Sequence, residues 1–242
     1  MAPIILKNAK LYLGGFNLSG DLNQMALNYG ADMLEVTTFN DAAKRRIAGL
    51  FDVSADLQGY YQAGTNPDLV DKILWDKLAL QDEIMTVCPT TGAAGEVAYF
   101  TKVIEATYTP GGSVGEVFPF SVEAQGTERL VRGIVAETGA KTATVTGTAR
   151  NLGAVTASQK LYAAMHVIAA SGTTPTLDVT IESDDANTFL TPVTRITFAQ
   201  ATAIGAQWKE AAGDISDIWY RPVLTIGGTT PSFTIALLLG II

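Results

Sequence analysis

Cysteine and histidine are almost absent from this 242-residue chain, which contains one of each. With Cys88 alone, the chain cannot build an internal disulfide framework, and a cysteine-held metal cluster is excluded equally. Cys88 ends an apolar stretch and has no cysteine or histidine near it in sequence. It is therefore expected to be a buried, inert thiol. No metal and no other cofactor is expected.

Catalytic residues are equally scarce. His166 lies in the apolar run Tyr162-Ala-Ala-Met-His-Val-Ile, where strand alternation puts it on the face of Tyr162 and Ala164. This pattern predicts a half-buried strand histidine. A Ser-His-Asp relay would have to use His166, and the chain has no G-x-S-x-G elbow. The sequence thus predicts a protein that is not an enzyme, and a hydrolase with an unrecognised site is the least favoured function.

Charged residues are also few. They make up 17% of the chain, below the roughly 25% of an average soluble domain. Part of the surface is therefore expected to contact protein. The net charge is −8, and residues 1–135 contain 10 basic and 16 acidic residues. The only basic run is Lys44, Arg45 and Arg46, so tight nucleic-acid binding is not expected.

Neither end of the chain predicts a membrane segment. The first residues lack the basic-then-apolar pattern of a signal peptide, so export by a standard signal is not expected. The apolar end 233–242 is shorter than the about 20 residues that a spanning helix needs. It is expected to form a buried final strand.

Alternating apolar and polar residues predict strands throughout both halves, for example at 52–58, 118–122 and 177–182. One helix is predicted over about 67–80. Asn66 and Pro67 give it a cap and a first-turn proline, and an apolar stripe runs from Leu69 to Leu78. The expected fold class is all-β, an antiparallel sandwich or barrel with one packed helix, followed by a second antiparallel sandwich.

A domain boundary is expected near residue 135, because residues 132–154 turn to threonine, alanine and glycine. The predicted domains are 1–135 and 136–242. Beyond the boundary, Ser171-Gly-Thr-Thr-Pro and Gly227-Gly-Thr-Thr-Pro share a spelling that is typical of hairpin turns. A weak echo between Lys10-Leu-Tyr and Lys160-Leu-Tyr leaves open whether the second domain is an appended domain or a duplicate of the first.

The segment 38–50 is longer than an ordinary hairpin connection and is predicted to be a contact loop. It combines the basic run with apolar side chains that a solvated loop does not need. A short helix capped by Asn40 or Asp41 is a compatible alternative. The predicted contact residues are Thr38, Phe39, Asp41, Lys44, Arg45, Arg46, Ile47 and Leu50.

Several motifs of the first 135 residues resemble the major tail tube proteins of long-tailed (siphovirus-type) bacteriophages. They are Gly-Phe-Asn-Leu-Ser-Gly-Asp-Leu-Asn at 15–23, Leu-Asn-Tyr-Gly-Ala-Asp-Met-Leu-Glu-Val-Thr-Thr-Phe at 27–39, Ile-Ala-Gly-Leu at 47–50 and Gly-Tyr-Tyr at 59–61. The resemblance implies a tail-tube fold in residues 1–135, with a strand pair, the long loop, one helix and a closing pair at 98–109 and 114–126.

The resemblance also implies a function and partners. Subunits would close into sixfold or pseudo-sixfold rings whose sheets join edge to edge, and the rings would stack into the tube that delivers DNA. The loop 38–50 would reach the next ring, and acidic residues would line the lumen, where DNA passes without specific binding. The other implied partners are the tape measure, tail terminator and distal tail or baseplate proteins, in a virion assembled in the host cytoplasm.

Two alternatives stay open beside the tube. One is another structural protein of the tail or baseplate. The other is a carbohydrate-binding sandwich on a virion surface, in which Trp208, Trp219 and Tyr220 would supply stacking faces, although buried sandwich aromatics are the favoured interpretation.

Overall fold

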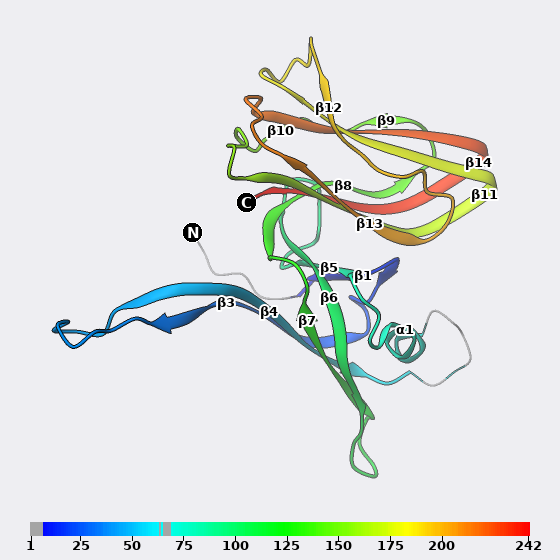
Figure 1. Cartoon of the computed structure of the whole chain (residues 1–242). Helices are drawn as coiled ribbons and strands as arrows, with labels where there is room; N and C mark the ends of the chain where they lie inside the picture. The colour runs from blue at the N-terminus through cyan, green and yellow to red at the C-terminus, as the bar shows by residue number, and fades with distance from the viewer. Residues whose placement is uncertain (1–6, 63, 65–68) are drawn as a thin grey trace. The chain divides into compact units, whose positions relative to one another are not determined.

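The structure is a computed structural model that describes residues 7–62, 64 and 69–242 (Figure 1). All its paired strands are antiparallel, and α1 is the single helix of the described chain. The all-β antiparallel class is therefore confirmed. The elements are β1 (Lys10–Leu13), β2 (Phe16–Asn17), β3 (Leu22–Glu35), β4 (Arg46–Tyr60), α1 (Val70–Lys77), β5 (Glu83–Cys88), β6 (Val97–Pro110), β7 (Pro119–Gly126), β8 (Val131–Lys141), β9 (Val145–Thr146), β10 (Arg150–Asn151), β11 (Lys160–Asp184), β12 (Val193–Thr197), β13 (Gly205–Ala212) and β14 (Trp219–Ile241).

The chain divides into two compact units, each assembled from separated segments. Unit 1 comprises residues 1–20, 83–100 and 131–242, and unit 2 comprises 21–82 and 101–130. The change in composition had instead predicted two consecutive domains meeting near residue 135. Pairing between residues distant in the chain produces the discontinuous units, because β1 pairs with β5 and the start of β8 pairs with the start of β6.

Unit 2 is a four-stranded antiparallel sheet with the helix beside it. Its strand order is β3–β4–β7–β6, with residues 101–110 of β6 at one edge. The predicted strand 52–58 lies in β4 and buries Val53, Ala55 and Leu57, while the alternating residues stay polar. The predicted closing pair is confirmed as the β6–β7 hairpin.

Helix α1 is shorter than the predicted 67–80. It spans Val70–Lys77 and buries Val70, Ile73 and Leu74, the centre of the predicted stripe. It ends where Leu78 takes an extended conformation and bridges to Glu105 of β6. The predicted cap at residues 66–68 lies outside the described residues.

Unit 1 contains a central layer that is buried on both faces. Alternate residues of β11, including Leu161 and Met165, join one hydrophobic cluster, and the intervening Tyr162 and Ala164 join another. The final strand β14 does the same, with Leu237 in the first cluster and Leu238 in the second. Double-sided burial explains why these strands read as continuous apolar runs, and it confirms the buried final strand.

Strands β11 and β14 pass from this central layer into an outer layer through paired kinks. The segments predicted as hairpin turns, 171–175 and 227–231, are instead these kinks, lying within the two long strands and beside each other. Ser171 pairs with Ser232, and Thr176 pairs with Gly227, across irregular register. In Figure 1 both strands fold over at this corner. The prediction of separate turns was wrong, because the same glycine and threonine conformations here bend a pair of strands.

No helix among the described residues has the length and apolar character required to cross a membrane.

Candidate assembly surface

A long two-stranded ribbon extends from the sheet of unit 2 (Figure 1). Strands β3 and β4 stay paired from Leu22 opposite Gly59 to Glu35 opposite Arg46. Strand β7, however, pairs with β4 only between Ser54 and Tyr60. We call residues 29–35 and 46–53 the ribbon and residues 36–45 its tip. Within the described chain, no strand pairs with the outer edge of β3, and between Arg46 and Val53 strand β4 pairs with β3 alone, so its other edge has no partner strand there.

The ribbon exposes large apolar side chains on both faces. Leu50 is 81% exposed and Met33 66% exposed, and Phe39 at the tip is completely exposed. The other exposed large apolar side chains of this region are Tyr29, Leu34, Val36, Ile47 and Phe51. Isolated two-stranded ribbons are marginally stable in water, and free strand edges with apolar side chains pair readily with other chains. The ribbon therefore has the character of a surface that another chain covers.

The contact segment 38–50 is not one loop. Arg46, Ile47 and Leu50 belong to β4, so the connection is limited to residues 36–45, and no helix forms there. The apolar residues at 47 and 50 do not alternate with polar ones, so the sequence pattern predicts a loop where the structure has a strand. In the structure, Gly49 and Leu50 lie at a register irregularity opposite Asp32.

The tip is held by its own polar residues. The carboxylate of Asp41 accepts hydrogen bonds from the backbone N–H of Thr38 (2.8 Å) and from its hydroxyl (2.9 Å). The hydroxyl of Thr37 accepts a bond from the N–H of Arg45 (3.0 Å), and the N–H of Val36 bonds to the Arg45 carbonyl (2.9 Å). Thr38 and Asp41 thus fix the turn that presents Phe39.

Two of the three basic residues have acidic partners on the ribbon or its tip. Lys44 Nζ lies 3.2 Å from the Glu35 carboxylate, and Arg45 lies 3.7 Å from Asp41. Both cations are 67% exposed, so these ion pairs contribute little stability. Arg46 forms no ion pair with any residue that the structure describes.

The structure adds exposed residues that the sequence pattern did not single out. Tyr29 and Phe51 stack with ring centroids 5.3 Å apart, and Met33 and Leu34 are exposed on successive positions of β3. The sequence does contain adjacent apolar residues here, which in a strand lie on opposite faces. Such a pair occurs both in a strand that is buried on two faces and in a strand that is exposed on two faces, so the sequence alone does not distinguish a buried strand from an exposed one.

The polar face of the unit 2 sheet carries two acidic residues at its centre. The register places Asp56 of β4 directly opposite Glu123 of β7, and both are exposed. Their neighbours on this face include Asn28, Ser54 and Gln125, and Asn28 Nδ2 donates to Ser54 and Asp56 at 3.3 Å. Like charges directly opposite each other destabilise a sheet. The acidic character of this face is therefore not explained by stability.

A groove lies where β7 leaves β4. Residues 49–51, 53 and 126–129 line a cavity of about 330 Å³. Gly126 permits the departure, because a Cβ there would come within 2.6 Å of Val53 Cβ. The guanidinium of Arg129 lies 4.6 Å from the centre of the Phe51 ring. The groove thus combines apolar side chains, a cation and the free edge of β4.

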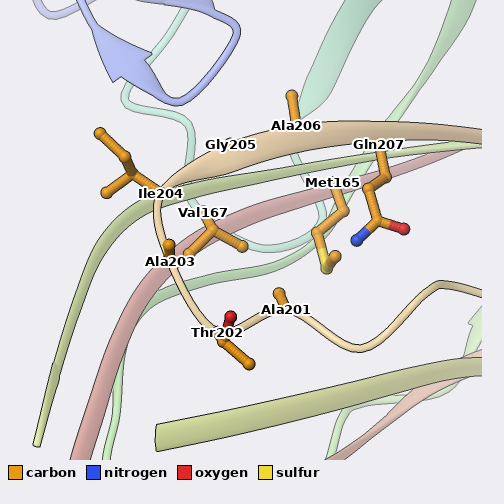
Figure 2. Close-up of a pocket in the computed structure, with 9 residues that line it drawn as sticks. All are labelled: Met165, Val167, Ala201, Thr202, Ala203, Ile204, Gly205, Ala206 and Gln207. Carbon is orange, nitrogen blue, oxygen red and sulfur yellow. The ribbon is translucent and has the colours of Figure 1, made fainter.

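Unit 1 contains another cavity, which has no catalytic character. It has a volume of about 240 Å³ and is lined by Met165, Val167 and residues 201–207 (Figure 2). None of these nine residues is titratable. The amide of Gln207 is held by two hydrogen bonds of 2.8 Å to the backbone of Ala199.

His166 is completely buried, not half-buried as predicted. Its Nδ1 lies 2.7 Å from the carbonyl oxygen of Gly14, which can only accept, so Nδ1 carries the proton. Its Nε2 then accepts a bond from the Thr86 hydroxyl at 2.8 Å. Desolvation lowers the pKa of His166 to about 4. The neutral imidazole is therefore a satisfied core group.

Cys88 is buried as predicted, and burial raises the pKa of its thiol to about 12. The acids at 182–185 are engaged locally. Asp184 accepts bonds from the N–H groups of Ala186 and Thr191, and Glu182 pairs with Arg221. Among the described residues, no group of three or more histidine, cysteine, aspartate or glutamate side chains could hold a metal ion.

The aromatic residues considered for sugar stacking do not form an exposed platform. Tyr220 is buried and donates its hydroxyl to the Asp217 carbonyl (2.9 Å). Trp208 is half-buried, with its ring 5.5 Å from those of Phe100 and Tyr162. Trp219 is half-buried in β14.

Comparison with solved structures finds low similarities. The SPP1 tail tube matches with a TM-score of 0.44 and 13% identity over 54% of this chain and 78% of that chain. The anti-feeding prophage tube-terminating cap gives a TM-score of 0.44 and 13% identity over 55% and 93%. The SPP1 Dit protein, described as a hub of the adsorption apparatus, gives 0.40 and 12% over 98% and 100%. These low similarities carry no functional argument.

No protein-family model matches the sequence, and no curated protein matches it. The functional proposal therefore rests on this chain's own residues.

Proposed function

We propose that this chain is a structural protein of a phage tail, a tail tube subunit that assembles with copies of itself into stacked rings. The rings would have sixfold or pseudo-sixfold symmetry and form the conduit for DNA. The observation that carries the proposal is the ribbon, which exposes apolar side chains on both faces and has two edges with which no described strand pairs. In an assembly, neighbouring copies cover these groups.

The motifs that resemble tail tube proteins support the same proposal, since residues 29–39 and 47–50 of these motifs lie in the ribbon and its tip. Ring closure would occur edge to edge and would use the outer edge of β3 in unit 2, with which no described strand pairs. Pairing of this edge would complete backbone hydrogen bonds that a single copy leaves open. Unit 1 would be an appended domain or a modified second copy of the tube fold. The tape measure, tail terminator and distal tail or baseplate proteins would be the other partners in the virion, after assembly in the host cytoplasm.

In this proposal the acidic residues on the polar face of the unit 2 sheet line the lumen of the tube. Asp56 and Glu123 would face the passing DNA, because they project from the side of the sheet opposite its buried residues. Repulsion between carboxylates and phosphates keeps DNA from adhering to the wall. That role would explain why two like charges are kept opposite each other.

Negative-stain electron microscopy of the purified protein tests the proposal. Annuli or tubes are expected. The decisive variant replaces residues 36–45 with Asn-Gly, which connects Glu35 directly to Arg46 by a two-residue hairpin turn. This variant should stay folded by circular dichroism and lose the stacking of rings.

The matched control is Val114→Ser, which removes another completely exposed apolar side chain, in the β6–β7 connection. It should retain stacking. A wild-type protein that stays monomeric at high concentration would sink the proposal. If the Asn-Gly variant forms normal tubes, the tip is not needed for the stacking of rings, although the protein would still be a tube protein.

A further inference from the structure

We propose that the loop between β11 and β12, residues 185–192, docks on unit 1 of a second copy of this chain, with Leu190 inserted into the unit 1 cavity that Figure 2 shows. This inference rests on the proposed self-assembly and adds to it a contact that unit 1 makes by itself. The contact involves neither the ribbon and its tip nor the edge of β3, all of which belong to unit 2.

Unit 1 exposes few large apolar side chains. Among its described residues they are Leu190 (84% exposed), Ile204 (48%) and Val193 (44%). Leu190 lies in the β11–β12 loop, Val193 begins the strand that follows it, and Ile204 lines the cavity. The exposed apolar surface of unit 1 is thus divided between one loop and one cavity, as expected if the loop and the cavity form the two sides of a single contact.

The β11–β12 loop is held at both ends by one buried carboxylate. Asp184 accepts a hydrogen bond from the N–H of Ala186 at 3.1 Å and another from the N–H of Thr191 at 2.9 Å. These bonds connect the first and last turns of the loop to the end of β11. The loop that carries Leu190 is therefore ordered before any partner arrives, which lowers the entropy that binding costs.

Phe189 fixes the loop at a second point. Its ring is buried and lies 4.2 Å from the guanidinium carbon of Arg221, which in turn pairs with Glu182 at 2.8 Å. Phe189 has a positive φ of 50°, a conformation that is rare for a bulky residue. Unfavourable backbone conformations of this kind are concentrated at functional sites. With Phe189 facing inward, the adjacent Leu190 is directed toward solvent.

The cavity suits an aliphatic side chain in size and in chemistry. Its volume is about 240 Å³, and none of its lining residues is titratable. Met165 and Val167 project into it from β11, and the segment 201–204 forms its other side (Figure 2). An apolar cavity of roughly 150 Å³ is large enough for a molecule of the size of benzene. The cavity can therefore receive the side chain of one leucine.

The charges beside the loop and beside the cavity are opposite in sign. Asp185 is the only charged residue of the loop, and Lys209 lies two positions after the cavity residue Gln207, on the same face of β13. Both are exposed, and neither forms an ion pair with a residue that the structure describes. Asp178 lies on the face of β11 opposite the cavity and is bonded to Gln200 at 3.0 Å. Attraction between the loop acid and the cavity cation would orient the loop and disfavour pairing of loop with loop.

The loop cannot fill the cavity of its own chain. Ala201 of the cavity pairs with Leu177, whereas the loop begins beyond the pairing of Ser183 with Val193. The distance along β11 from residue 177 to residue 183 is roughly 20 Å, at about 3.3 Å per residue. Each copy therefore offers its loop and its cavity to different neighbours. Such a heterologous contact repeats from copy to copy, whereas an isologous contact would stop at a dimer.

Disulfide trapping tests this contact. Leu190→Cys protein with an affinity tag is mixed with untagged Ala203→Cys protein, allowed to assemble and oxidised, because Ala203 is an exposed residue of the cavity lining. The disulfide between tagged and untagged chains is expected as the main product, and it should disappear on reduction. Wild-type protein gives the blank, since its only cysteine, Cys88, is buried. Ala157→Cys in place of Leu190→Cys is the matched control, because Ala157 is exposed in another turn of unit 1.

A second measurement does not depend on cysteine chemistry. Leu190→Ala should stay folded by circular dichroism and raise the protein concentration needed for assembly by about tenfold, the change expected when a hot-spot residue is truncated. Val114→Ala, at an exposed position of unit 2, should leave it unchanged. Assemblies that form normally but give no Leu190–Ala203 disulfide, or as much disulfide from Ala157→Cys, would overturn the inference while leaving the proposed function intact. Failure of the wild-type protein to assemble at all would overturn both.

Discussion

Gly172 and Gly228 make the same close approach to each other's strands. A Cβ on Gly172 would lie 2.8 Å from the carbonyl oxygen of Thr230, and a Cβ on Gly228 would lie 2.7 Å from that of Thr174. Both glycines have a positive φ, of 117° and 110°. Because β11 and β14 are antiparallel, the two kinks are related by a local twofold relationship. The corner that joins the two layers of unit 1 therefore requires glycine at both positions.

Gly172→Ala should destabilise the protein strongly, because the new methyl group meets both a left-handed backbone and a carbonyl oxygen. We expect a loss of about 2–4 kcal/mol in the free energy of unfolding, measured by urea denaturation. Gly139→Ala is the matched control, since Gly139 also has a positive φ (89°) but a Cβ added there would have no atom within 4 Å. It should lose only about 1 kcal/mol. Equal losses in the two variants would contradict the role of the close approach.

The paired kinks mark a limit of prediction from the sequence. Gly-Thr-Thr-Pro predicts a turn correctly in the sense that Gly172 and Thr174 both take left-handed conformations. Whether such a segment ends a strand or bends it depends on its neighbour, and the neighbour of 171–176 lies at 227–232. That pairing between segments distant in the chain leaves no local signal, although the shared spelling of the two segments was visible.

His166 should make stability depend on pH in a defined window. Its pKa is about 4 in the folded protein and near 6.5 when unfolded, so the unfolded state binds the proton first. The stabilisation is complete above pH 6.5 and is lost as the pH falls toward 4. The loss should reach roughly 3 kcal/mol. Urea midpoints between pH 7 and 4.5 measure it.

His166→Gln supplies the comparison, because it removes the titrating group and keeps a polar side chain beside Thr86 and Gly14. This variant should be less stable at pH 7 and lose less stability between pH 7 and 4.5. The pKa values of Glu96 and Asp217 are lowered in the folded protein, so these groups also make stability depend on pH. Their effect falls in a more acidic range, because carboxyl groups of unfolded chains titrate near pH 4. Parallel pH profiles of the two proteins would show that His166 is not the titrating group.

His166 also shows that sequence periodicity predicts the face on which a strand residue lies but not how deeply it is buried. Alternation correctly placed the histidine on the face of Tyr162 and Ala164. It indicated half-burial, because a strand with one apolar face usually has water on the other. Residues of β1 and β5, among them Tyr12 and Ile84, cover the face on which His166 lies. That cover comes from distant strands, so no local pattern predicts it.

Asp41→Ala should loosen the tip without unfolding the protein. The substitution removes both bonds from Thr38 and the ion pair with Arg45, all of them at the surface. The free energy of unfolding should change by less than about 1 kcal/mol. Amide hydrogen exchange at Thr38 should accelerate, and the concentration needed for assembly should rise. Asn40→Ala, at the neighbouring exposed position, should change neither, and an Asp41→Ala protein that assembles normally would contradict a pre-organised tip.

The sequence predicted a contact loop at 38–50, and in the structure residues 46–50 of this segment belong to strand β4. Charge and apolar residues in one connection pointed to 38–50, and the structure places Phe39 and the basic residues on the ribbon or its tip. The sequence pattern did not predict a strand at residues 46–50, because a ribbon that is exposed on both faces needs no alternation of apolar and polar residues. Its role in assembly stays a prediction that the tip replacement tests.

Asp56→Asn should stabilise the isolated subunit. The register places Asp56 directly opposite Glu123, and two carboxylates in this position repel each other. Removing one charge should raise the free energy of unfolding by about 0.2–1 kcal/mol, with a larger gain at low salt than at high salt. Glu116→Gln is the control, because it changes the net charge equally in a connection between strands. If both variants gain the same stability, relief of general net charge is the cause, whereas a gain confined to Asp56→Asn identifies the cross-strand pair. Such a gain would mean that the wild-type chain keeps this pair at a cost in stability, as expected of residues that serve the lumen of a tube.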